Sequence, residues 1–198
     1  RFINNALERD PRVDVKGVVY RQPYLGILQD TFFPRTLDLP DAADDIADSP
    51  FAEPDLVILG DVSPDEIPEV GWQMLEKFVS ESGGTLVFIA GKQHFPLAYQ
   101  SKIVERLLPM TELRPINIDG ATAKAPPSER GFHLKLTAEG EDMDVMQFDP
   151  DPQQNRDIWA GLAGHTWGLL GEAKPGANVF AYAIQPGEED NVENERKN

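Results

Sequence analysis

Two apolar runs near the middle of the chain, with an amphipathic segment between them, predict a strand, a helix and a second strand. The runs cover residues 56–59 and 85–90. Unbroken apolar runs of this length are typical of strands buried on both faces of a parallel sheet. The segment between them has apolar residues at helical spacing over residues 70–82, and Gly83 suits the left-handed position that closes a helix. This order predicts a right-handed βαβ crossover.

Weaker patterns precede this unit. Apolar residues at helical spacing predict a helix over residues 2–7, and a valine-rich run predicts a strand over residues 13–20. Prolines interrupt residues 21–54, where we expect a long surface loop with a short helix at 41–48. The sequence Ser63-Pro64-Asp65-Glu66 has the pattern of a capping box with proline at the first helical position, and it predicts a helical turn there.

In the second half, shorter apolar segments alternate with proline and glycine. A helix is predicted to end before Pro109, and a proline-containing stretch follows from residue 114 to residue 127. Alternating apolar residues over 132–136 predict a strand with one solvated face, after which Thr137 can cap a short acidic helix. The remaining expected elements are a helix at 155–162, a turn at 174–177 and a strand at 179–184.

The length and the net charge limit the classes of protein to which this chain can belong. The chain has 198 residues, enough for one domain with a sizeable core, and we place that domain at residues 1–185, followed by an acidic tail at 186–198. The formal net charge is −16, which argues against binding nucleic acid or adsorbing to anionic lipid. No apolar stretch approaches the roughly 20 residues that span a bilayer. The chain starts at Arg1 without a signal peptide, so we expect a soluble piece of a longer polypeptide.

Several motifs together resemble one family. They are R-F-I-N-N-A-L-E-R-D-P-R-V, D-L-V-I-L-G-D-V, L-E-K-F-V-S-E-S-G-G-T-L-V-F-I-A-G, L-L-P, L-T-A-E-G and K-P-G-A-N-V. This set is similar to the class I glutamine amidotransferase-like domain, which in bacteria is commonly part of larger membrane-associated proteins. The resemblance implies a flavodoxin-like, three-layer α/β sandwich with a mostly parallel central sheet. Family members usually continue with a glycine-rich strand pair after the K-P-G-A strand, where this chain has its acidic tail.

The chemistry of active glutamine amidotransferases is missing. Such enzymes place a cysteine in a Gly-x-Cys-x-Gly turn, which corresponds here to the turn at residues 89–93, and they use histidine and glutamate from a later loop. This chain has no cysteine, and neither Ala90 nor Gly91 can attack an amide. We therefore expect no catalytic residues and no cofactor. The expected role is a binding module within a membrane-tethered bacterial protein, with other domains of that protein or a separate protein as partner.

The candidate site lies where the two central strands end. Ligands of open α/β sheets bind at the carboxyl ends of the strands. The candidate residues there are Gly60, Asp61, Gly91, Lys92, Gln93 and His94. The competing interpretation is an ordinary turn that glycine makes possible, with solvated side chains and no ligand.

Two other functions stay open. A hydrolase of altered chemistry would pair His94 or His165 with a carboxylate such as Asp61. A sugar- or metabolite-binding domain would need the rings of Trp159 and Trp167 to line one cleft. His133 falls on the solvated face of its strand and predicts nothing beyond exposure.

Known ligand motifs are absent. The acidic run that starts at Asp149 fails as a calcium loop, because Gln154 stands where a glycine is needed and Ala160 where a glutamate is needed. We therefore expect no metal. The chain has no G-x-S-x-G motif, no dinucleotide-binding glycine motif and no phosphate-binding loop of the Walker type.

Overall fold

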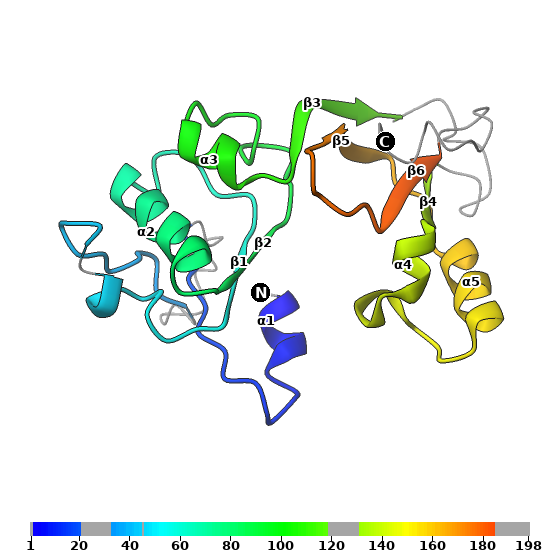
Figure 1. Ribbon diagram of the computed structural model, residues 1–198, viewed down its shortest axis with the longest axis horizontal. Helices are drawn as coiled ribbons and strands as arrows, with labels where there is room; N and C mark the ends of the chain where they lie inside the picture. The colour runs from blue at the N-terminus through cyan, green and yellow to red at the C-terminus, as the bar shows by residue number, and fades with distance from the viewer. Residues whose placement is uncertain (1, 21–32, 45, 119–130, 185–198) are drawn as a thin grey trace, which may run out of the picture. The chain divides into compact units, whose positions relative to one another are not determined.

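The computed structural model describes residues 2–20, 33–44, 46–118 and 131–184 (Figure 1). The chain divides into two compact units, residues 1–107 and residues 108–198, each of which we describe by itself. The expected acidic tail lies outside the described residues, as do residues 21–32 and 45 of the loop expected over residues 21–54. The single domain over residues 1–185 stays a prediction.

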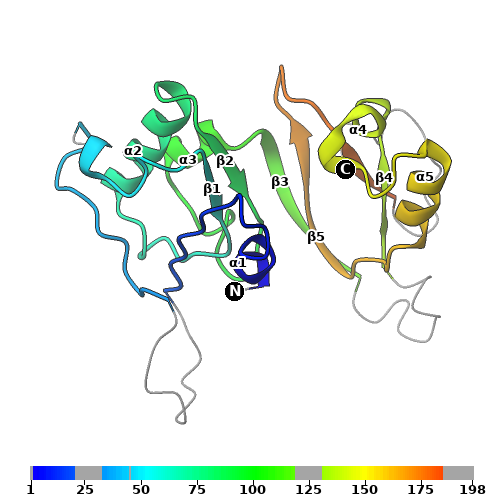
Figure 2. The same ribbon diagram turned by 90° about the horizontal axis from the view of Figure 1, so that it is seen from below.

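The first unit contains the predicted strand–helix–strand. Strands β1 (Leu56–Leu59) and β2 (Thr85–Phe88) are parallel, in a register from Leu56 opposite Thr85 to Leu59 opposite Phe88. Helix α2 (Glu69–Ser80) connects them and lies beside the strand pair (Figures 1 and 2). The remaining elements of this unit are α1 (Phe2–Leu7), the 3₁₀ turn η1 (Ile46–Asp48) and α3 (Lys102–Leu107).

The core of the first unit lies under α2. Trp72, Met74, Leu75 and Phe78 are at most 2% exposed, so the helix buries one broad apolar face. The chain leaves α2 through Gly83 at φ +72°, the left-handed conformation predicted for this glycine. This turn delivers the chain directly into β2.

The start of α2 agrees with the prediction of a turn at residues 63–66 and a separate helix from about residue 70. The capping-box pattern at residues 63–66 forms a turn, in which the Glu66 amide donates to the Ser63 carbonyl at 3.0 Å, and the helix begins at Glu69. Pro68 separates the turn from the helix, because its ring disfavours a helical conformation at Ile67 and it has no amide to continue a helix.

Residues 13–20 do not form the predicted strand. A strand needs a ladder of hydrogen bonds to a neighbour along its length, whereas residues 13–20 belong to no such ladder within the described ranges; the Val19 amide donates to the Pro34 carbonyl at 2.9 Å. The valines here are half-buried or exposed. High strand propensity alone therefore did not produce a strand.

The two parallel strands are not buried on both faces, as their apolar runs had predicted. Leu56 is 45% exposed and Val87 is 38% exposed, although both belong to continuous apolar runs. Helix α2 covers the opposite face, where Phe88 contacts Trp72 with ring centroids 6.5 Å apart. Within the first unit, the described residues therefore cover one face of the pair much better than the other.

The second unit is built on two antiparallel strand pairs. Strand β3 (Met110–Asn117) pairs with β5 (Trp167–Ala173), and β4 (His133–Leu136) pairs with β6 (Ala181–Ile184). A single bridge between Phe132 and His165 links the two pairs. Phe132, Leu170 and Ala183 form the buried core.

Two of these strands were missed in the sequence. Pro115 lies inside β3, and Gly168 and Gly171 lie inside β5, residues that usually argue against a strand. Strand β3 is irregular between Thr111 and Arg114, which marks a bulge. Pairing of the two strands over most of their length outweighs these poor local propensities.

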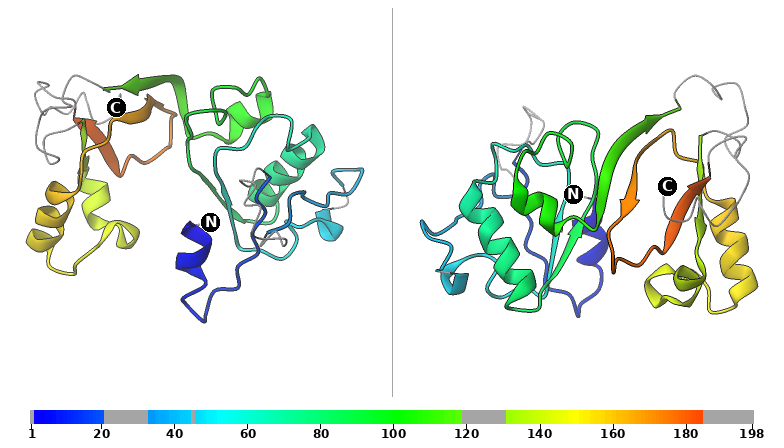
Figure 3. Two further views of the ribbon diagram at one scale, coloured as in Figure 1. Left: turned by 180° about the vertical axis from the view of Figure 1, so that it is seen from behind. Right: turned by 45° about the horizontal axis from the view of Figure 1, so that its top comes forward.

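The second unit confirms the cap predicted at Thr137, and a second cap, at Asp151, starts the later helix earlier than the predicted residue 155. Thr137 accepts a hydrogen bond from the Gly140 amide at 2.9 Å and begins α4 (Ala138–Asp142). The 3₁₀ turn η3 (Asp144–Met146) follows, and α5 (Pro152–Gly161) begins after Asp151, whose carboxylate accepts from the first amides of the helix. Helices α4 and α5 lie side by side (Figure 3).

The described parts of the chain therefore form a mixed α/β structure with one parallel and two antiparallel strand pairs. None of the helices in these parts combines the length and the apolar character needed to cross a membrane.

Burial under α2 makes a direct prediction. Leu75→Ala removes a side chain that is 0% exposed, and we expect it to lower the free energy of unfolding by about 2–5 kcal/mol. Val79, on the same helix, is 37% exposed, so Val79→Ala is the matched control, with an expected loss below about 1 kcal/mol. Urea unfolding followed by the fluorescence of Trp72 measures both, and equal losses would contradict the packing of α2.

Candidate functional site

The carboxyl ends of β1 and β2 lie next to each other, as predicted. The Ile89 amide donates to the Leu59 carbonyl at 2.8 Å, so the parallel pairing continues to the last residue of β1. Gly60 and Asp61 then follow β1, and residues 90–94 follow β2. The six candidate residues therefore lie on the two segments that leave this end of the strand pair.

The side chain of Asp61 connects these two segments. Its Oδ1 accepts hydrogen bonds from the amides of His94 and Phe95, both at 2.8 Å, and its Oδ2 accepts one from the Gln93 amide at 3.0 Å. Hydrogen bonds to a carboxylate are stronger than those between neutral groups. Three successive amides of the loop are thus held by one side chain, and we call this arrangement the Asp61 clamp.

The Asp61 clamp leaves no room for a side chain at residue 91. A Cβ atom on Gly91 would lie 2.0 Å from Cγ of Asp61 and 2.4 Å from its Oδ2. Real Cβ atoms essentially never make contacts this short. A glycine at this position is therefore a condition for the Asp61 clamp.

The clamp also sets the ionisation of Asp61. Partial burial on its own would raise the pKa of this carboxyl, but the amides of Phe95, Gln93 and His94 outweigh burial and the net pKa is lowered. The folded protein therefore favours the charged form of Asp61.

The loop after Gly91 packs through aromatic side chains. The Gly91 amide donates to the Phe95 carbonyl at 2.9 Å, and the Phe95–Pro96 peptide bond is cis. Phe95 is 1% exposed and stacks on Trp72 and Phe88, with ring centroids 6.3 and 4.9 Å away. The apolar side of the loop is thus buried against α2 and β2.

Tyr99 completes this cluster. Its ring contacts those of Trp72 and Phe95, each with centroids 5.3 Å apart, and its hydroxyl donates to the Val62 carbonyl at 2.9 Å. Burial raises the pKa of Tyr99 to about 12. Our sequence reasoning missed this cluster, although the spacing of four residues between Phe95 and Tyr99 was visible.

The structure brings the candidate residues together mainly through their backbones. Asp61 contributes its carboxylate, Gln93 and His94 contribute amides, and Gly91 contributes the absence of a side chain. The side chains of Lys92 and Gln93 are exposed. Neither of the two cavities described for this protein includes any candidate residue.

His94 has one feature of a functional histidine. Its Nε2 atom is buried and makes no hydrogen bond to any residue that the structure describes. Its amide, rather than its ring, contacts Asp61. The described residues thus provide no histidine–carboxylate hydrogen bond of the kind that a general base needs.

The predicted tryptophan slot is not formed. Trp167 and His165 line a cavity of about 220 Å³ in the second unit, together with Phe132, whose ring stacks on that of His165 with centroids 5.5 Å apart. Trp159 does not line this cavity, because its ring packs on Phe148 and its Nε1 donates to the Met146 carbonyl at 2.9 Å. His133, expected to be exposed, is half-buried in β4.

Metal binding has no support in the described ranges. Residues 2–20, 33–44, 46–118 and 131–184 contain no group of three or more histidine or acidic side chains arranged to hold a metal ion.

Comparison of this chain with protein-family models, with curated proteins and with solved structures found no match. The likeness of its motifs to the glutamine amidotransferase-like family therefore stands on the quoted residues alone.

The space around residue 91 predicts a contrast between two neighbouring glycines. Gly91→Ala puts a Cβ atom onto the carboxylate of Asp61, and we expect a loss of about 2 kcal/mol or more in the free energy of unfolding. Gly60→Ala is the matched control, because a Cβ atom there meets nothing within 4 Å. Urea unfolding of both variants makes the comparison, and a Gly91→Ala protein as stable as Gly60→Ala would contradict the clamp.

The pKa of Asp61 predicts how the clamp responds to pH. Because the folded pKa lies below the ordinary value of 3.8, the carboxylate contributes stability above about pH 4 and loses it as the pH falls through the folded pKa. We expect Asp61→Asn to lower the free energy of unfolding by about 1 kcal/mol at pH 7, because Asp61 is exposed and solvent weakens its hydrogen bonds. This difference from the wild type shrinks as the pH falls below about 4, because the unfolded state then takes up a proton at Asp61 more readily than the folded state.

Urea unfolding between pH 7 and pH 3 measures this difference. Asp65→Asn is the control, since the Asp65 side chain is exposed and donates or accepts no hydrogen bond with any residue that the structure describes. A difference for Asp61→Asn that stays constant over this range would show that the ionised carboxylate does not hold the loop.

Proposed function

We propose that this chain is a non-catalytic glutamine amidotransferase-like domain with a flavodoxin-like sandwich, acting as a binding or interaction module of a larger membrane-associated bacterial protein. The fold part of the proposal is supported by the parallel β1–α2–β2 unit, which is the repeating element of such a sandwich. The quoted motifs support the family. The lack of a nucleophile supports a binding role.

The observation that carries the proposal is the occupied space next to Gly91. In an active member of the family, the turn after this strand presents a thiol, and the thiolate is the attacking group. Here the carboxylate of Asp61 takes that space, 2.0 Å from where a Cβ atom of residue 91 would lie. A carboxylate that accepts three amide hydrogen bonds is a poor nucleophile, because attack would require giving up those bonds.

The same arrangement suits a module that presents a rigid loop. The clamp fixes the backbone of residues 93–95, and the aromatic cluster buries Phe95 below it. Lys92 and Gln93 project from this fixed loop with exposed side chains. Preorganised loops of this kind bind partners without the entropic cost of ordering.

A metabolite-binding domain is the second candidate, and one observation favours it. The cavity of about 220 Å³ beside Trp167 and His165 is lined mostly by apolar side chains with a single imidazole, the usual composition of a small-ligand pocket. The hydrolase candidate has less support, because the buried Nε2 of His94 has no carboxylate partner among the described residues.

A glutaminase assay tests the proposal. We expect the purified chain to release no ammonia from glutamine above the level of a buffer blank, because it has no thiol and its only acid at the turn is engaged by amides. Turnover that persists in the purified wild type and disappears in His94→Ala would overturn the proposal in favour of the hydrolase. The Lys92→Ala variant, altered at an exposed side chain of the same loop, is the control for unspecific effects.

A further inference from the structure

A different surface, in the second unit, combines exposed apolar side chains with a hollow. Met143 is 37% exposed, Phe148 is 59% exposed and Val145 is 77% exposed, although all three are large and apolar. Phe148 lines a hollow of about 550 Å³ together with Asp142, Asp144 and other residues of the segment between α4 and α5. We call this surface the α4–α5 hollow and include in it the exposed Val145, which follows the lining residue Asp144 in η3.

Hydrogen bonds hold this surface in place, so its exposure is not the result of a loose segment. The Phe148 amide donates to Oδ1 of Asn155 at 2.8 Å, and Asn155 is only 2% exposed. Trp159 donates from Nε1 to the Met146 carbonyl at 2.9 Å, and its ring contacts that of Phe148 with centroids 5.3 Å apart. Asn155 and Trp159 of α5 thus hold the backbone of this segment in place, while the apolar side chains of Val145 and Phe148 are exposed to solvent.

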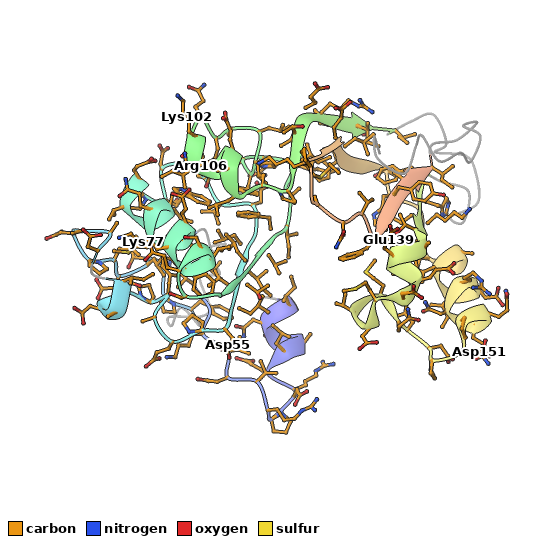
Figure 4. The ribbon with its side chains drawn as sticks, in the orientation of Figure 1. Asp55, Lys77, Lys102, Arg106, Glu139 and Asp151 are labelled. Carbon is orange, nitrogen blue, oxygen red and sulfur yellow. The ribbon has the colours of Figure 1, made fainter. Side chains whose placement is uncertain are left out.

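The charged side chains around the hollow are almost all negative. Residues 137–162 carry seven carboxylates, including Glu139 and Asp151 (Figure 4), and the only basic residue among them is Arg156. Arg156 is already paired with Glu141 at 3.3 Å. Neither the Asp142 nor the Asp144 carboxylate makes a hydrogen bond or ion pair with any residue in the described ranges, and both line the hollow.

We propose that the α4–α5 hollow docks a cationic segment of a partner protein, in which lysine or arginine side chains flank a large apolar side chain. The apolar side chain would pack on Phe148 and Val145, and the cations would lie against Asp142 and Asp144. A second copy of this chain fits poorly, because it would bring carboxylates against carboxylates. This inference rests on the proposed binding role and gives it a surface and a partner chemistry.

The test uses fluorescent peptides as probes and the chain of residues 1–198. One peptide alternates lysine and leucine, a second replaces each leucine by serine, and a third replaces each lysine by glutamate. Fluorescence anisotropy should show the lysine–leucine peptide binding at least about tenfold more tightly than the other two. Binding should weaken as salt rises from about 0.05 M to about 0.5 M, where the screening length falls severalfold.

Matched variants locate the binding. Val145→Ser combined with Phe148→Ser should weaken binding about tenfold, whereas Ile3→Ser combined with Leu97→Ser, at similarly exposed apolar positions, should leave it unchanged. Asp142→Asn combined with Asp144→Asn should weaken binding severalfold and reduce its salt dependence. Asp41→Asn combined with Asp48→Asn makes the same change in net charge elsewhere and should have no effect. Circular dichroism checks that each variant is folded.

Four results would overturn this inference. They are absence of peptide binding, equal weakening by the two aspartate pairs, equal binding of the serine and leucine peptides, and self-association of the chain that the Val145→Ser and Phe148→Ser changes abolish. None of these experiments measures glutamine turnover, so a failure of the inference can be distinguished from a failure of the proposed function. Absence of peptide binding with no turnover refutes only the inference, and turnover with intact peptide binding refutes only the non-catalytic role.

Discussion

The hydrogen bonds from three loop amides to one carboxylate hold together the carboxyl ends of the two parallel strands in the first unit. Asp61 follows β1, the amides of Gln93, His94 and Phe95 follow β2, and their contact holds together the two ends of a parallel pair that is only four residues long. Gly91 is required because any larger residue would overlap that carboxylate. The buried ring of Phe95 then ties the same loop to Trp72 on α2. The hydrogen bonds of Asp61 thus link the ends of β1 and β2 to the loop, and the loop to the core under α2.

This contact is also the reason why we propose binding rather than catalysis at the turn after β2. Catalysis at such a turn needs a reactive group with space around it for a substrate. The Asp61 clamp fills that space with an ionised group whose oxygens are already engaged. The second unit offers the opposite situation, where Val145 and Phe148 are exposed on an anchored backbone and Asp142 and Asp144 face a hollow. The exposed apolar and acidic side chains that we propose for recognition are therefore in the second unit, and not at the site predicted from the ends of β1 and β2.

Sequence patterns predicted the parts of the fold that depend on local signals. The parallel unit, the left-handed Gly83 and the Thr137 cap follow from periodicity and from caps within a few residues. The failures depend on partners far along the chain. Residues 13–20 have strand propensity but belong to no strand ladder within the described ranges, whereas β3 and β5 contain proline and glycine and pair over most of their length. The juxtaposition of the segments that follow β1 and β2 was predicted from the parallel strands, whereas the pattern does not reveal that Asp61 turns toward the loop amides.

The position of the Asp61 side chain is the most direct test of this account, and a high-resolution crystal structure at neutral pH would determine it. The account predicts both carboxylate oxygens within hydrogen-bond distance of the amides of residues 93–95, with no side-chain-sized space beside Gly91. A carboxylate that points into solvent, with an open pocket next to Gly91 and the loop amides bound to water, would contradict it.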